Sequence, residues 1–202
     1  MEKRSLRACL GKEWLYCDGG TGSLLQEKGL KGGELPERWN LERPEDVIEI
    51  AESYFRAGAD IVNTNTFGAN RLHYADKAEL EQIVRAGVRH VKEGLSRSGR
   101  TDGFVALDLG PTGRLLKPMG DLEFETCVEI FAEVVRWGKE EGADLVLIET
   151  MSDAMEAKAA VLAAKENSDL PVFVTVVFDE KGKTLTGGTV ESVTAMLEGL
   201  RV

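Results

Sequence analysis

Three carboxylate side chains end apolar stretches of the chain, where buried strands would finish. They are Asp18, Asp108 and Glu149. Carboxylates that lie close together bind an ammonium group through charge-assisted hydrogen bonds. If the three meet, they form an acidic pocket for a cationic group such as the α-ammonium of an amino acid. Alternatively, each carboxylate caps the following helix or meets solvent, and the residue types alone leave both interpretations open.

Two further polar segments follow predicted strands. Asn63 and Thr64 come directly after a short apolar stretch, and a glycine-rich segment, Gly19–Gly22, follows Asp18. This segment matches neither the dinucleotide-binding nor the P-loop glycine pattern, so we do not expect it to bind phosphate. Glycine tolerates backbone conformations that other residues avoid, and we expect close approach of a small substrate there.

Metal ligation and nucleophilic catalysis find little support in the residue spacing. The cysteines Cys9, Cys17 and Cys127 and the histidines His73 and His90 form neither a C-x-x-C nor an H-x-x-x-H pattern. No G-x-S-x-G segment is present. We therefore predict no metal ligand and no catalytic nucleophile in this chain.

The elements that would position these side chains alternate between strand and helix. Apolar runs predict strands over Glu13–Asp18, Ala59–Asn63, Gly103–Asp108, Asp144–Glu149 and Pro171–Val177. Helical spacing of apolar residues predicts helices over Pro44–Ala57, Ala78–Leu95, Glu123–Glu141, Asp153–Lys165 and Val190–Leu200. The last three strands are apolar on both faces, which is typical of a parallel sheet covered by helices. Such a chain is either an open doubly wound sheet or part of a TIM barrel, and both bind ligands at the carboxyl ends of the strands.

Composition narrows the class of protein. The chain has 202 residues, 43% of them hydrophobic, and a net charge of −10. An acidic surface repels phosphate backbones and anionic membranes, so we expect neither nucleic acid nor a membrane as a partner. No stretch is long and apolar enough to span a bilayer, and the N-terminus does not look like a signal peptide. Three cysteines without a disulfide spacing are typical of a reducing compartment, and we expect the protein to be cytoplasmic.

Five segments, in order along the chain, resemble the homocysteine S-methyltransferase family. They are Asp18–Gln26, Asn63–Asn70, Gly110–Asp121, Ile148–Asp153 and Phe178–Gly187. The TNTFGAN and GPTG segments look closest to the branch that includes cobalamin-dependent methionine synthases. The family fold is a TIM barrel, so the resemblance implies an α/β chain that forms a partial (β/α)8 barrel of about five βα units. We expect an N-terminal arm over residues 1–12 and the truncated barrel domain over residues 13–202.

The resemblance also implies a chemistry, which is methyl transfer to the thiol of L-homocysteine to give methionine. In the family, zinc binds the sulfur and deprotonates it. Methylcobalamin on a separate domain is the expected methyl donor, and cobalamin-binding and folate-binding domains of a parent enzyme are the expected partners. Residues at the family's homocysteine contacts are Asp18, Gly19 and Glu149, with Asn63, Thr64 and Asp108 expected in the same pocket.

The sequence departs from the family at the metal. Three cysteines after strands six and eight hold the zinc in the family, and none of the cysteines here matches those positions. We therefore expect a homocysteine-binding portion that does not turn over alone, and that self-associates through exposed sheet edges. A second hypothesis is a non-catalytic amino-acid-binding or assembly module. A third is a self-contained five-stranded α/β protein of unrelated function.

Overall fold

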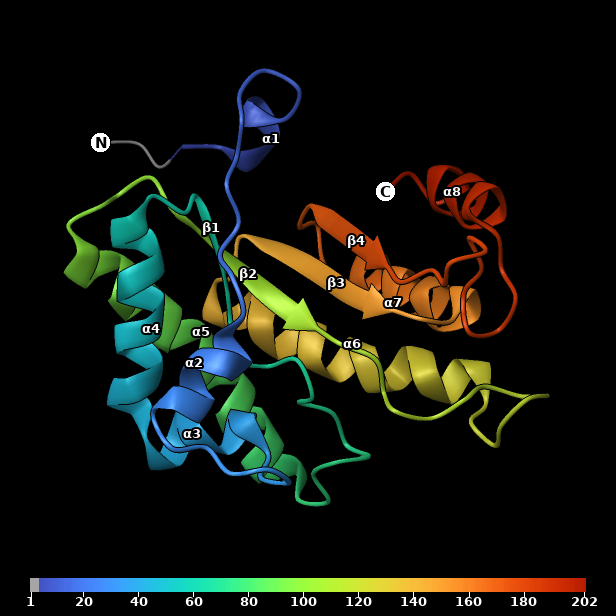
Figure 1. Ribbon diagram of the computed structural model, residues 1–202, viewed down its shortest axis with the longest axis horizontal. Coiled ribbons are helices and arrows are strands. Elements are labelled where there is room, and N and C mark those ends of the chain that lie inside the picture. Colours follow the sequence, from blue (N-terminus) through green and yellow to red (C-terminus); the bar gives the residue numbers. More distant parts are fainter. Residues whose placement is uncertain (1–3) are drawn as a thin grey trace.

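A computed structural model of the chain describes residues 4–202. Its centre is a parallel sheet in which strands adjacent in sequence are adjacent in space, in the order β1-β2-β3-β4. The strands are β1 (Ile61–Asn63), β2 (Phe104–Leu109), β3 (Leu145–Met151) and β4 (Val172–Val176). Parallel neighbours need a crossover connection, and a long helix follows each strand (Figure 1). All carboxyl ends of the strands therefore lie at one edge of the sheet.

The helices confirm most of the sequence-based expectation. They are α1 (Leu6–Cys9), α2 (Thr21–Glu27), α3 (Trp39–Glu42), α4 (Pro44–Ala57), α5 (Lys77–Ser98), α6 (Phe124–Glu141), α7 (Ala154–Asn167) and α8 (Val190–Gly199), with a 3-10 turn at Pro36–Arg38. Helices α4 to α8 lie within three residues of their predicted bounds. Local signals explain this accuracy: Asp76 caps α5 by accepting hydrogen bonds from two backbone N–H groups, and Gly58 ends α4 with a φ of 105°. The short helices α1 to α3 were not predicted, because one or two turns give no periodic pattern.

The first predicted strand, Glu13–Asp18, is wrong in its extent. The segment reaches the sheet through an isolated parallel bridge between Cys17 and Ile61, supported by backbone hydrogen bonds that Tyr16 and Asp18 make. Its only described neighbour, β1, is three residues long, so no longer ladder forms. The first of the five βα units is present, with its strand reduced to this bridge.

The two faces of the sheet have different surroundings. Helices α4 to α7 cover one face, where alternate strand residues such as Val105, Val146 and Ile148 join the main core (Figure 1). On the opposite face, Leu6 and Cys9 of the N-terminal segment pack at the amino ends of the strands. The expectation that the last strand is buried on both faces is wrong. Strand β4 is half-buried and its Thr175 is exposed, because among the described residues β4 has a strand neighbour on one side only.

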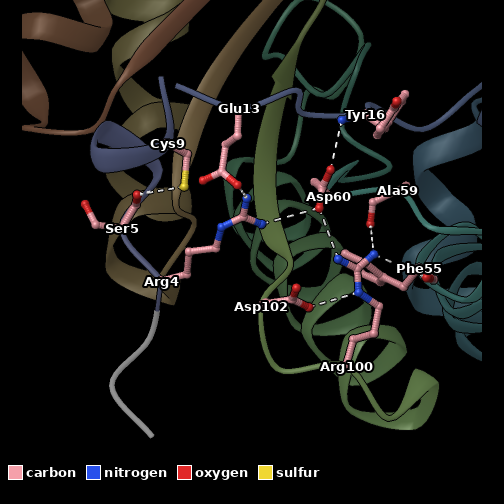
Figure 2. Close-up of polar contacts among 10 residues, drawn as sticks. All are labelled: Arg4, Ser5, Cys9, Glu13, Tyr16, Phe55, Ala59, Asp60, Arg100 and Asp102. Atoms are coloured by element: carbon pink, nitrogen blue, oxygen red, sulfur yellow. Dashed lines mark hydrogen bonds and ion pairs between the residues drawn. The ribbon is translucent and has the colours of Figure 1, made fainter. Parts of the chain in front are cut away.

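An ion-pair network ties the N-terminal segment to the sheet (Figure 2). Asp60, which directly precedes β1, is 9% exposed. Its carboxylate accepts hydrogen bonds from Arg4 at 3.4 Å, Arg100 at 3.1 Å and the backbone N–H of Tyr16 at 3.0 Å. Arg100 also pairs with Asp102 at 2.9 Å. One buried carboxylate thus joins three separate segments of the chain.

Replacing this carboxylate should destabilise the fold. We expect Asp60→Ala to lower the free energy of unfolding by about 2–4 kcal/mol, because it removes the buried acceptor that Arg4, Arg100 and the backbone N–H of Tyr16 share. Urea unfolding followed by circular dichroism measures the change. Asp102→Ala is the matched control, because that side chain is 49% exposed and its loss should cost less than about 1 kcal/mol. Equal losses in the two variants would contradict the role assigned to Asp60.

Within residues 4–202, no helix combines the length and the hydropathy that crossing a membrane requires.

Candidate functional site

A cavity of about 930 Å³ opens at the carboxyl ends of the strands. All six residues predicted from the sequence line it, and so do further residues from the loop before α2, from β4 and from α8. Of the described residues that line it, four are carboxylates and none is a lysine, an arginine or a histidine. The acidic members are Asp18, Glu37, Asp108 and Glu149. The electrostatic potential of such a cavity favours a cationic ligand.

Asp18 lies where the N-terminal segment joins the sheet. Its backbone N–H donates to the carbonyl of Ile61 at 2.9 Å, and its carboxylate accepts the backbone N–H of Asn63 at 2.8 Å. Burial, with the nearby charge of Glu149, raises the pKa of Asp18 to about 6. The next residue is Gly19. A Cβ atom at this position would lie 3.1 Å from the hydroxyl oxygen of Tyr54, which is a tight contact.

Asp108 is the second-last residue of the buried strand β2 and is 5% exposed. Hydroxyl groups hold its backbone: Thr64 accepts the N–H at 3.1 Å, and Thr66 donates to the carbonyl at 2.8 Å. The two hydroxyls are 2.6 Å apart, so Thr64 is engaged in positioning Asp108. The carboxylate oxygen Oδ1 of Asp108 is buried without a hydrogen-bond partner among the described residues. Burial, then repulsion from Glu149, Asp18 and Glu37, raises the pKa of Asp108 well above its ordinary value.

Glu149 and Asn63 both line the cavity, and their side chains are in contact. The Nδ2 atom of Asn63 donates to Oε2 of Glu149 at 3.4 Å, which is a long hydrogen bond. The amide oxygen of Asn63 is buried and has no partner within residues 4–202. Burial raises the pKa of Glu149. Two buried acceptors and two further carboxylates therefore surround a space into which the described part of the chain places no cationic side chain.

The backbone beside Glu149 is strained. Thr150 has a φ of 60°, which is unusual for a β-branched residue and costs about 1–3 kcal/mol. The strain coincides with a register shift between β3 and β4, where Ile148 pairs with Val174 and Met151 with Val176. Such strain persists only where the surroundings enforce it, and it concentrates at functional sites.

Two further residues of the site escaped the sequence analysis. Glu37 is 3% exposed, and it accepts the N–H of Gly68 at 2.7 Å and the hydroxyl of Tyr74 at 2.9 Å. Thr175 projects from β4 and accepts the backbone N–H of Thr150 at 2.9 Å. Glu37 lies within the single 3-10 turn Pro36–Arg38, so no strand pattern could flag it. Thr175 lies opposite the bulge in β3, and the alternation of apolar residues in the sequence does not predict a bulge.

The described residues do not fit a zinc ion. Among residues 4–202, no three or more His, Cys, Asp or Glu side chains come close enough together to hold a metal. Cys17 lines the cavity, whereas Cys9 and Cys127 are buried elsewhere. Burial and the charges of Asp18 and Glu149 raise the pKa of the Cys17 thiol, which disfavours the thiolate that zinc binds.

The fold and the cavity define a class of protein. Parallel βα units that share a polar cavity at the carboxyl ends of their strands are typical of TIM-barrel enzymes. Comparison with solved structures agrees. The homocysteine methyltransferase MmuM from Escherichia coli in its oxidized form superimposes with a TM-score of 0.85 at 21% identity, over 98% of this chain and 74% of that one. Its metallated form gives a TM-score of 0.84 over 96% of this chain and 74% of that one. The partial-barrel fold is therefore confirmed.

Sequence comparison supplies the family. The family model for homocysteine S-methyltransferase matches residues 15–202. Methionine synthase from Mycobacterium leprae (strain TN) is 33% identical over 212 residues, which cover 96% of this chain and 17% of that protein. The chain belongs to the homocysteine S-methyltransferase family. It spans about a sixth of the length of this methionine synthase.

Proposed function

We propose that this chain is the homocysteine-binding portion of a methyltransferase that forms methionine. The observation that carries the proposal is the pair of buried acceptors, Asp108 Oδ1 and Asn63 Oδ1, in a cavity that carboxylates line and to which residues 4–202 contribute no basic side chain. A buried acceptor without a partner is costly, and a ligand that donates several hydrogen bonds removes the cost. The α-ammonium of an amino acid has three such donors and the complementary charge.

The residues around the cavity contribute to ligand binding in different ways. Asp18 and Glu149 supply negative charge, and Asp108 and Asn63 supply the unsatisfied acceptors. Gly19 lines the same cavity, while Thr64 and Thr66 hold the end of β2 in place. This arrangement holds the amino end of homocysteine in place. The position of the thiol then follows from how the amino end is held. Orientation of this kind is a large part of catalysis between two bound groups.

The methyl donor and the metal come from outside the described residues. Similarity to a methionine synthase supports methylcobalamin on another domain as the donor, with cobalamin-binding and folate-binding domains as partners. When bound, zinc would supply the deprotonation of the thiol. Because the described side chains form no metal-binding group, we propose that the isolated chain binds homocysteine without methylating it.

Calorimetric titration of L-homocysteine into the chain, with and without equimolar zinc, tests the proposal. We expect binding that does not depend on zinc. We expect 4-mercaptobutanoate, which lacks the ammonium group, to bind at least about tenfold more weakly, since it leaves the buried acceptors unpaired. An assay with methylcobalamin and homocysteine should show no turnover.

The other outcomes separate the hypotheses. Equal binding of the two ligands would show that the acidic cavity does not recognise the ammonium. Zinc-dependent binding would place metal ligands among residues that the present geometry does not identify. Methylation at an enzymatic rate would overturn the proposed inactivity of the isolated chain. Absence of any binding would favour an assembly module, in which the family membership reflects ancestry alone.

A further inference from the structure

The bulge in β3 solves a geometric conflict at the site. Side chains of a strand alternate between its two faces, so Leu147 and Glu149 face the cavity while Ile148 faces the helices. By the same alternation, Met151 would face the cavity as well. It instead lies fully buried in the core beneath the helices.

One extra residue in β3 produces this reversal. Between the pairs Ile148–Val174 and Met151–Val176, β3 contributes Glu149 and Thr150 where β4 contributes Thr175 alone. A β-bulge of this type shifts the alternation by one residue. It lets Glu149 face the cavity and Met151 enter the core. Without it, one of these two side chains would lie on the wrong face.

The backbone N–H of Thr150, in the bulge, forms no hydrogen bond within the β3–β4 ladder. The side chain of Thr175 accepts it instead. The Oγ1 atom of Thr175 accepts the N–H of Thr150 at 2.9 Å. Thr150 has the left-handed φ of 60° that the bulge imposes, so this bond fixes the residue directly after Glu149 in an unfavourable conformation. Both Thr175 and Glu149 line the cavity.

We propose that Thr175 is a positioning residue for the amino-acid site: its hydroxyl holds the strained bulge that directs the Glu149 carboxylate at the ligand's ammonium group. Thr175 acts through the backbone of Thr150 and needs no contact with the ligand. The inference rests on the proposed function for the identity of the ligand. The geometry of the bulge stands apart from that assignment, and the test has a readout for each.

Measurements of L-homocysteine binding compare four variants with the unmodified chain. Thr175→Val keeps the β-branched shape and removes the acceptor, and we expect it to weaken L-homocysteine binding at least about tenfold, equivalent to about 1.4 kcal/mol. Thr175→Ser keeps the hydroxyl and should retain affinity. Adding Thr150→Gly to Thr175→Val should recover part of the affinity, because glycine adopts a positive φ without strain. Thr194→Val, at an exposed position of α8, is the matched control and should change nothing.

A double-mutant cycle separates positioning from general damage to the fold. In a Glu149→Gln background, Thr175→Val should weaken binding by less than about twofold, because the group that it positions is already neutral. Equal effects of Thr175→Val in both backgrounds, or no effect in either, would overturn the proposal.

The second readout does not need a ligand. The carboxyl carbon of Glu149, followed by NMR during a pH titration, reports its pKa directly. We expect Thr175→Val to move this pKa down toward the ordinary value of a glutamate, because a released Glu149 turns toward water. If homocysteine fails to bind the unmodified chain, the proposed function fails, and this titration still decides the positioning role. An unchanged titration curve would overturn that role.

Discussion

Glu149→Gln should weaken L-homocysteine binding by about 100-fold, equivalent to about 2.7 kcal/mol. The substitution keeps the shape of the side chain and removes its charge. Hydrogen bonds between an ammonium and a carboxylate are about twice as strong as those between neutral groups, and this one forms in a partly buried cavity. Calorimetry at neutral pH measures the loss.

Two comparisons make this result specific. Glu166→Gln removes a carboxylate from the exposed side of α7 and should leave the affinity unchanged. Glu149→Gln should also lose the preference for L-homocysteine over 4-mercaptobutanoate, because the preference depends on pairing the ammonium. A variant that loses affinity for both ligands equally would indicate that Glu149 shapes the cavity and does not recognise the amino group.

The affinity for L-homocysteine should fall by about tenfold between pH 7 and pH 5, if protonation of Asp18 abolishes its pairing with the ammonium. Burial raises the pKa of Asp18 to about 6, so this carboxylate gains a proton within that window. The ammonium stays charged throughout, and the raised pKa values of Glu149 and Asp108 act in the same direction. Affinity that is constant over this range would exclude Asp18 from the site.

Stability should respond to pH in the opposite direction. The folded-state pKa of Asp18 lies above the ordinary value of 3.8, so the protonated form is favoured by folding. This contribution to stability is fully present below pH 3.8 and is lost as pH rises through 6. Asp18→Asn, which keeps an acceptor for the N–H of Asn63, should therefore raise the free energy of unfolding at pH 7 by about 1–2 kcal/mol after allowance for partial exposure.

The same substitution should weaken homocysteine binding, so Asp18→Asn separates function from stability. Urea unfolding at pH 7 and at pH 4 measures the first effect, and the gain should shrink at the lower pH. A variant that loses both stability and affinity would show that Asp18 has a structural role in joining the N-terminal segment to β1.

The long elements and the edge of the sheet that carries the site could be predicted from local sequence. Pro44 and Gly58 bound α4, and Asp76 caps α5, because these residues act through their own backbone geometry. Asp18, Asp108 and Glu149 end apolar stretches, and parallel strands bring such ends to one edge. Resemblance to a family then selected the partial barrel over an open doubly wound sheet, which periodicity alone could not do.

The burial and the contacts of each of these side chains depend on the tertiary structure. The burial of Asp108 beside three other carboxylates depends on residues far apart in the chain. The same is true of the hydroxyl pair that holds Asp108 and of the contact between Glu37 and Gly68. The shortened first strand and the half-buried β4 depend on which neighbours each segment has, and a strand pattern does not contain that information. The bulge at Thr150 arises because Glu149 and Met151 must face opposite sides of one sheet, a constraint that exists only once the sheet is formed.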